Sequence, residues 1–147
     1  MAKKLSYKPL TETEKRICLL KLKPIEKKVR RALKKTKYFC PTEFTSIMEN
    51  FGFQTFNPFQ STGDLFLRDN KKKIIVKIPY LVANRPKRAV PTICVPVRGY
   101  QTIYIQPLVN TNVSEDVSWK LRGLHEDCDI HKRNVGIYRN KAVLFDW

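Results

Sequence analysis

The sequence predicts a small α+β protein in which basic helices precede an antiparallel sheet, and three observations support this fold class. The chain has 147 residues, of which 42% are apolar, enough for a modest core in a single domain. Apolar residues recur at helical spacing over the first 35 positions. Short β-prone runs separated by polar turns then follow between residues 51 and 107, which favours strands joined by short loops.

Residues 1–40 are predicted to form a basic helical extension. Thr11 and Glu14 have the spacing of a capping box, in which each side chain bonds the other residue's backbone amide at a helix start. Pro24 suits the first turn of a second helix, so we expect one helix on either side of it. The residues expected to face inwards are Ile17, Leu20 and Leu22 in the first helix and Ile25, Val29, Ala32 and Leu33 in the second.

Positive charge is concentrated in this extension. The whole chain has a formal net charge of +16, and residues 1–40 contain 14 Lys and Arg against three Glu. A field of this sign attracts anionic partners before any specific contact forms. We therefore expect residues 15–35 to contact nucleic acid or an acidic protein partner, with a solvated helix face that keeps the protein soluble as the alternative.

Residues 41–147 are predicted to form the main domain. It begins with a helix at 41–50, which ends at Gly52 and turns Phe44, Ile47 and Met48 inwards. Five strands are expected, with 51–56, 64–67 and 74–78 as a meander and 91–97 and 102–106 as a second antiparallel pair. A helix from 115 to about 124 and a terminal hairpin, with its turn at Asn140-Lys141, complete the domain.

The terminal segment contains the polar residues with the most informative spacing. Asp129 is followed five residues later by Asn134, and Asp146 follows twelve residues further on, at the end of the expected hairpin. This Asp-x-His-x-x-Asn pattern, closed by Asp-Trp, resembles the catalytic loop of kinase-like phosphotransferases, in the form found in aminoglycoside phosphotransferases, choline kinases and small phage kinases. The resemblance implies that Asp129 orients the attacking hydroxyl and that Asn134 and Asp146 bind magnesium.

A second part of the resemblance lies upstream. The run Ile74-Ile-Val-Lys77-Ile is similar to the third-strand Val-Ala-Ile-Lys pattern, which implies that Lys77 is catalytic and binds the α- and β-phosphates of ATP. The fifth strand runs into the adenine-binding hinge of this family, which implies cofactor contacts through the backbone near Gln106 and Leu108. The expected fold is then a kinase-like N-lobe sheet followed by a minimal C-lobe that ends in the catalytic-loop hairpin.

The sequence departs from the family pattern in three places. Only Gly63 stands where a glycine-rich loop is expected. Residues 80–90 contain no acidic residue to pair with Lys77, so we expect the usual helix to be missing there. The sequence ends one residue after Asp146, so we expect no activation segment and no large helical platform for a substrate. Other elements offer three candidate partners for the lysine, Glu26, Glu43 and Glu49.

These features support two functional hypotheses. The first is an enzyme that uses ATP and magnesium to phosphorylate a hydroxyl of a protein or small molecule. The second is a catalytically inactive kinase-derived scaffold or virion-associated protein that binds nucleic acid or a partner through its basic N-terminus.

Other expectations concern metals and location. His125, Cys128 and His131 have two-residue gaps that suit a structural zinc site, although no fourth ligand is evident. The four cysteines lack paired spacing and no apolar run approaches the roughly 20 residues needed to span a bilayer. We therefore expect reduced thiols and a cytoplasmic protein with no membrane partner.

Overall fold

The computed structural model describes residues 5–36, 38–55, 65–69, 74–78, 89–97, 102–110, 112–122 and 135–144. These residues form the α+β structure that the sequence predicts, with three helices and a five-stranded antiparallel sheet. The chain divides into two compact units. The hairpin unit contains residues 1–15, 83–90 and 109–147, and the sheet unit contains residues 16–82 and 91–108.

Helix α1 spans Glu12–Lys34 and begins with the predicted capping box. The Thr11 amide donates to Glu14 Oε1 at 3.0 Å, and the Glu14 amide donates to Thr11 Oγ1 at 3.1 Å. The expectation of two helices is wrong, because Pro24 lies inside one continuous helix. Pro24 is exposed, and burial of the apolar stripe on both sides of it offsets the hydrogen bond that a proline cannot donate.

The buried stripe of α1 differs in part from the predicted one. Ile17 and Leu20 are 37% and 56% exposed, so their inward placement is wrong. Cys18 takes their place, since it lies four residues before Leu22 and extends the stripe by a turn. The stripe consists of Cys18, Leu22, Ile25, Val29 and Ala32, each at most 1% exposed.

Helix α2 spans Pro41–Asn50, the bounds that the sequence predicts. Phe44 and Met48 are fully buried, and the helix contacts β1 of the sheet. Gly52 has a φ of +95°, a conformation that favours glycine, and its amide donates to the carbonyl of Glu49 at 3.0 Å. The predicted helix stop is therefore confirmed.

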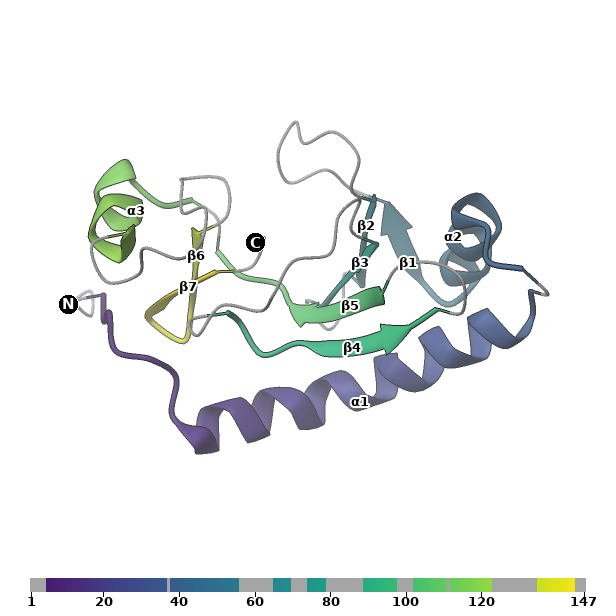
Figure 1. Cartoon of the computed structure of the whole chain (residues 1–147), viewed down its shortest axis with the longest axis horizontal. Helices are drawn as coiled ribbons and strands as arrows, with labels where there is room; N and C mark the ends of the chain where they lie inside the picture. The colour runs from purple at the N-terminus through teal and green to yellow at the C-terminus, as the bar shows by residue number, and fades with distance from the viewer. Residues whose placement is uncertain are drawn as a thin grey trace. The chain divides into compact units, whose positions relative to one another are not determined.

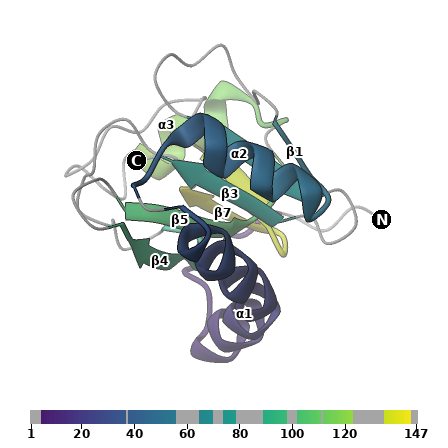
Figure 2. The ribbon, with the colours of Figure 1, turned by 90° about the vertical axis from the view of Figure 1, so that its right-hand side faces the viewer.

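The sheet unit contains an antiparallel sheet with strand order β1-β2-β3-β5-β4. Its strands are β1 (Phe53–Thr55), β2 (Leu65–Asp69), β3 (Ile74–Ile78), β4 (Ile93–Pro96) and β5 (Thr102–Pro107). The first three form the predicted meander, and β4 and β5 form the predicted second pair. Strand β5 also pairs with β3, and α1 runs along the β4 and β5 side of the sheet (Figures 1 and 2).

The strand register divides this sheet into an apolar face and a polar face. Residues paired directly across two strands turn their side chains to the same face, and successive residues alternate between faces. The apolar face contains Phe53, Leu67, Ile74, Val76, Ile78, Val95, Ile103 and Ile105, all buried. One buried charged residue, Asp69, shares this face, where it is paired with Phe53 and Ile74. The polar face contains Phe66, Arg68, Ile75, Lys77, Cys94, Tyr104 and Gln106.

The hairpin unit contains the predicted terminal hairpin, formed by β6 (Val135–Tyr138) and β7 (Lys141–Leu144). Its turn residues are Arg139 and Asn140, one position earlier than expected, with φ of 50° and 62°. Positive φ at both central residues is typical of a two-residue turn whose twist matches the strands. Helix α3 spans Glu115–Arg122, within the predicted range.

Segments distant in the sequence build the core of the hairpin unit. The amide of Ser6 donates to the carbonyl of Asn140 at 3.0 Å, and the amide of Ala142 donates to the carbonyl of Ser6 at 3.1 Å. The N-terminal segment is thereby paired with the last strand. The core consists of Val113, Val117, Leu121, Val135, Ala142 and Leu144, with Leu5, Tyr7 and Ile137 packed against it.

Candidate functional site

Lys77 occupies the middle of the polar face of the sheet. It lies on β3, paired with Phe66 of β2 and Tyr104 of β5. Lys77 is only 2% exposed. Its Nζ lies 5.7 Å from the centre of the Phe66 ring, which is a cation–π contact. Because moving an ammonium group out of water is costly, lysines are rarely buried this completely.

Further polar side chains share this face. Arg68 lies on β2 opposite Ile75, and Gln106 lies on β5 on the other side of Ile75. Gln106 is fully buried, and its Nε2 donates to Thr92 Oγ1 at 3.2 Å. Among the described residues, Gln106 Oε1 has no hydrogen-bond partner. This oxygen could therefore accept a hydrogen bond from a donor group of a ligand. Lys77 therefore belongs to a polar cluster.

The two residues expected in the hinge occupy different positions. Gln106 lies within β5, where pairing with β3 holds its backbone. Leu108 is half-buried and follows Pro107, the last residue of the strand. Contact of their backbones with adenine stays a prediction.

The terminal motif is described only around its hairpin. Asp129, Asn134 and Asp146 lie outside the described residues, as do Gly63 and the zinc candidates His125, Cys128 and His131. In the sequence, Asn134 immediately precedes β6, and Asp146 comes two residues after the end of β7. The strand, turn and strand expected between the two metal-binding candidates are therefore present.

Gly136 is a structural residue of this hairpin that the sequence analysis does not identify. A Cβ atom at this position would lie 3.0 Å from the Cβ of Val109 and 3.2 Å from the carbonyl oxygen of Asn110. The same approach lets Ile137 exchange two backbone hydrogen bonds with Asn110, at 2.8 and 3.0 Å. Only the position of a single glycine inside a β-prone run, between Val135 and Ile137, hints at it.

Glu14 ties the start of α1 to the hairpin. Lys141 Nζ donates to Glu14 Oε1 at 2.6 Å, and Arg139 Nε lies 3.7 Å from Glu14 Oε2. The hydrogen bond from Lys141, followed by that from the Thr11 amide, lowers the pKa of Glu14 from 4.5 to about 2. Glu14 therefore stays ionised through the physiological range.

Pairing of Lys77 with one of the three candidate glutamates stays a prediction. The carboxylate of Glu26 accepts a hydrogen bond from Arg30 Nε at 3.0 Å. Glu43 and Glu49 are exposed, whereas Lys77 is buried.

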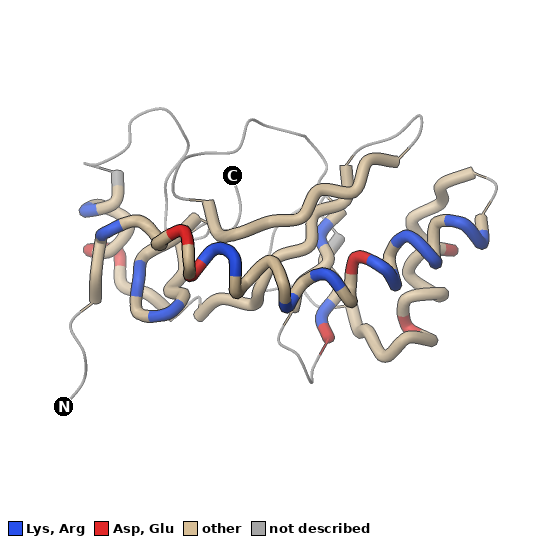
Figure 3. The backbone as a smooth tube through the Cα atoms, turned by 90° about the horizontal axis from the view of Figure 1, so that it is seen from below, with Lys and Arg blue, Asp and Glu red and all other residues tan. Residues whose placement is uncertain are grey.

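The predicted basic surface is present on α1. Lys and Arg recur along the whole helix (Figure 3), and most of them are exposed. Glu26 is one of only three acidic residues in the helix. The helix therefore presents a strongly positive surface.

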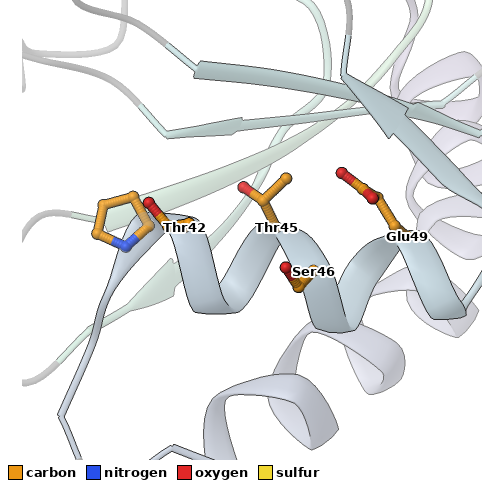
Figure 4. A pocket seen from close by; sticks show the side chains of 5 residues that line it. Thr42, Thr45, Ser46 and Glu49 are labelled. Carbon is orange, nitrogen blue, oxygen red and sulfur yellow. The ribbon is translucent and has the colours of Figure 1, made fainter.

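An open pocket of about 430 Å³ lies along α2. Thr42, Thr45, Ser46 and Glu49 line one side of the helix with hydroxyl and carboxylate oxygens (Figure 4). The described residues that line it include no Lys or Arg, so they do not suit the phosphates of a nucleotide.

Metals, disulfides and membrane spans can be assessed for the described residues alone. Among these residues, no group of three His, Cys, Asp or Glu could hold a metal ion. Cys18, Cys40 and Cys94 are free thiols, as predicted. No helix in the described part combines the length and apolar character needed to cross a bilayer.

Comparisons with protein-family models, curated protein sequences and solved structures find no match for this chain. The kinase-like resemblance therefore stays a prediction from the motifs of the sequence.

Proposed function

We propose that the chain is a kinase-like phosphotransferase that binds ATP and magnesium and transfers the γ-phosphoryl group to a hydroxyl of a protein or small molecule. The observation that carries this proposal is the polar face of the sheet, where buried Lys77 and half-buried Arg68 lie on adjacent strands. Two cations on one sheet face favour a polyanionic ligand, because the oxygens of a phosphate group can accept charge-assisted hydrogen bonds from more than one cation.

The strand order supports the same ligand. Lys77 is on the third strand of five, and its neighbour is the fifth strand, although β4 lies between them in the sequence. In the kinase-like arrangement the lysine strand holds the phosphates and the fifth strand leads to the adenine site. Gln106 and Leu108 are the residues proposed to contact adenine through their backbones.

The remaining roles follow the terminal motif. We assign Asn134 and Asp146 to magnesium, which would neutralise charge developing on the phosphates, and Asp129 to the attacking hydroxyl. The described hairpin supports this assignment, since the paired residues Val135 and Leu144 at its open end adjoin the segments with Asn134 and Asp146.

The test is the melting temperature of the purified chain with and without ATP and magnesium. A ligand that binds only the folded state, at 100 times its Kd, stabilises it by about 2.7 kcal/mol. For a chain of this length, that stabilisation raises Tm by roughly 5–10 °C. We expect such a rise for the wild type and none for Lys77→Met or Asp146→Ala.

Lys8→Met is the matched control, because Lys8 is exposed and the substitution removes the same charge. A rise that survives Lys77→Met, or that Lys8→Met abolishes equally, would contradict a phosphate site at Lys77. No rise for the wild type at millimolar ATP and magnesium would contradict nucleotide binding as a whole.

A further inference from the structure

Helix α1 presents a row of cations on the side opposite its buried stripe. The row, called the α1 ridge here, consists of Arg16, Lys23, Lys27, Arg31 and Lys34, all exposed. Their separations of seven, four, four and three residues place them on one helix face. The ridge covers 18 residue steps, which at the rise of an α-helix is about 27 Å.

The charge of the α1 ridge is not neutralised within the described part of the chain, where none of its five residues forms an ion pair. The three glutamates of α1 already have other partners. Glu12 pairs with Lys15 at 3.4 Å, Glu26 with Arg30 at 3.0 Å and Glu14 with Lys141 at 2.6 Å. The ridge is therefore available to an external anion.

The burial of α1 argues against a membrane surface as that anion. A helix that lies in the membrane interface inserts its apolar face among the lipids. The apolar face of α1 is already buried, since Cys18, Leu22, Ile25, Val29 and Ala32 are each at most 1% exposed.

The composition of the ridge argues against a protein partner. Protein interfaces depend on a few well-packed apolar or aromatic anchors. Ile17 and Leu20, 37% and 56% exposed, are the exposed large apolar side chains of α1, and both precede Lys23, so the ridge from Lys23 to Lys34 has no such anchor beside it. Evenly repeated cations without anchors match an evenly repeated anion.

We propose that the α1 ridge binds the phosphate backbone of a nucleic acid without reading its bases. Phosphates of one duplex strand repeat about every 3.4 Å along the axis, so a row of about 27 Å can neutralise several of them. The ridge has no Asn or Gln with which to read adenine, and its two arginines, Arg16 and Arg31, which could read guanine, are separated by 15 positions of the helix. This binding is separate from the nucleotide site proposed at Lys77.

The test is fluorescence anisotropy of a labelled random-sequence 30-mer, as duplex DNA and as single-stranded RNA, titrated at several salt concentrations. Five phosphate contacts predict a slope of log K against log salt of about −4 to −5 for duplex DNA. The triple variant Lys23→Gln, Lys27→Gln and Lys34→Gln should make the slope about 3 units shallower and weaken binding on the order of a hundredfold. Replacing the same three lysines by arginine should preserve binding.

The matched control is Lys8→Gln, Lys21→Gln and Lys120→Gln, which removes the same charge from exposed positions off the ridge. Equal weakening by this control would overturn the proposal, because binding would then follow net charge alone. Tighter binding to anionic lipid vesicles or to polyglutamate than to either nucleic acid would also overturn it. Lys77→Met should leave nucleic-acid binding unchanged, which separates the ridge from the nucleotide site.

Discussion

Gly136 of β6 lies against Val109 and Asn110, at a distance that leaves no room for a side chain. We expect Gly136→Ala to destabilise the chain by about 1–3 kcal/mol, because the added methyl group forces the neighbouring segment to shift. Urea unfolding followed by circular dichroism would measure the loss.

The control for this substitution is Val109→Ala. Because it removes the Val109 Cγ2 atom, the nearest atom to the new methyl group, the double variant should lose less stability than the two single variants together. Strict additivity would show that the contact with Val109 is not the cause.

At the residue scale, local patterns are predicted well and non-local contacts are not. The spacing of Thr11 and Glu14 is sufficient to identify the capping box. The β-run around Lys77 identifies its strand, but its burial and its place beside Arg68 depend on register with β2. The need for glycine at position 136 depends on a segment more than 25 residues away, which no local signal reports.

The start of helix α1 is stabilised by the carboxylate of Glu14, which accepts hydrogen bonds from the Thr11 amide and from Lys141. The stability of the chain should therefore depend on pH. Folding lowers the pKa of Glu14 to about 2, so its stabilising effect is complete above pH 4.5 and is lost as the pH falls through 2. We expect Glu14→Gln to lower Tm at pH 7, and the difference from the wild type to vanish near pH 2. Thermal melts across this range would measure it.

Glu12→Gln is the control for this prediction, because Glu12 is in the same helical turn and its side chain is 86% exposed. It should change Tm little at any pH, as expected for an exposed ion pair. A pH dependence of equal size in both variants would assign the effect to the helix dipole rather than to Lys141.

Element boundaries follow from the sequence wherever the local signals agree. The bounds of α2 are exact, because Pro41 suits the first turn and Gly52 provides the stop. Pro24 is misleading, since its cost to a helix is small beside the burial of a stripe that continues past it. The hairpin turn is displaced by one residue because Arg139, which is not a typical turn residue, adopts a positive φ.

At the scale of the whole molecule, the two units interleave along the chain, and the sequence does not predict this. Residues 1–15 belong with 109–147, and Ser6 pairs with the last strand. The charge distribution instead predicts a boundary near residue 40, where the density of Lys and Arg falls. Pairing of sequence-distant backbone segments leaves no trace in charge or periodicity.

The proposed reaction assigns different roles to its polar residues, so binding can be separated from chemistry by substitution. Lys77 lies on β3, whereas Asp129, Asn134 and Asp146 lie outside the described residues. Because Asp129 is assigned to the attacking hydroxyl and not to the phosphates, Asp129→Ala should retain the rise in Tm with ATP and magnesium. Its rate of ATP turnover should nevertheless fall by about 10²–10⁴-fold, the usual contribution of a general base.

Turnover can be measured without a known acceptor. The two quantities are the release of ADP and the transfer of a phosphoryl group to the chain itself, which mass spectrometry detects. Lys77→Met should lose both the Tm rise and turnover, whereas Asp129→Asn, which keeps the shape of the side chain without its charge, should behave like Asp129→Ala. Turnover that is unchanged in both Asp129 variants would exclude this residue from the chemistry. The Tm measurement reports binding of the nucleotide, and the turnover measurement reports its reaction. A chain that binds ATP but does not turn it over would therefore fit the scaffold hypothesis instead.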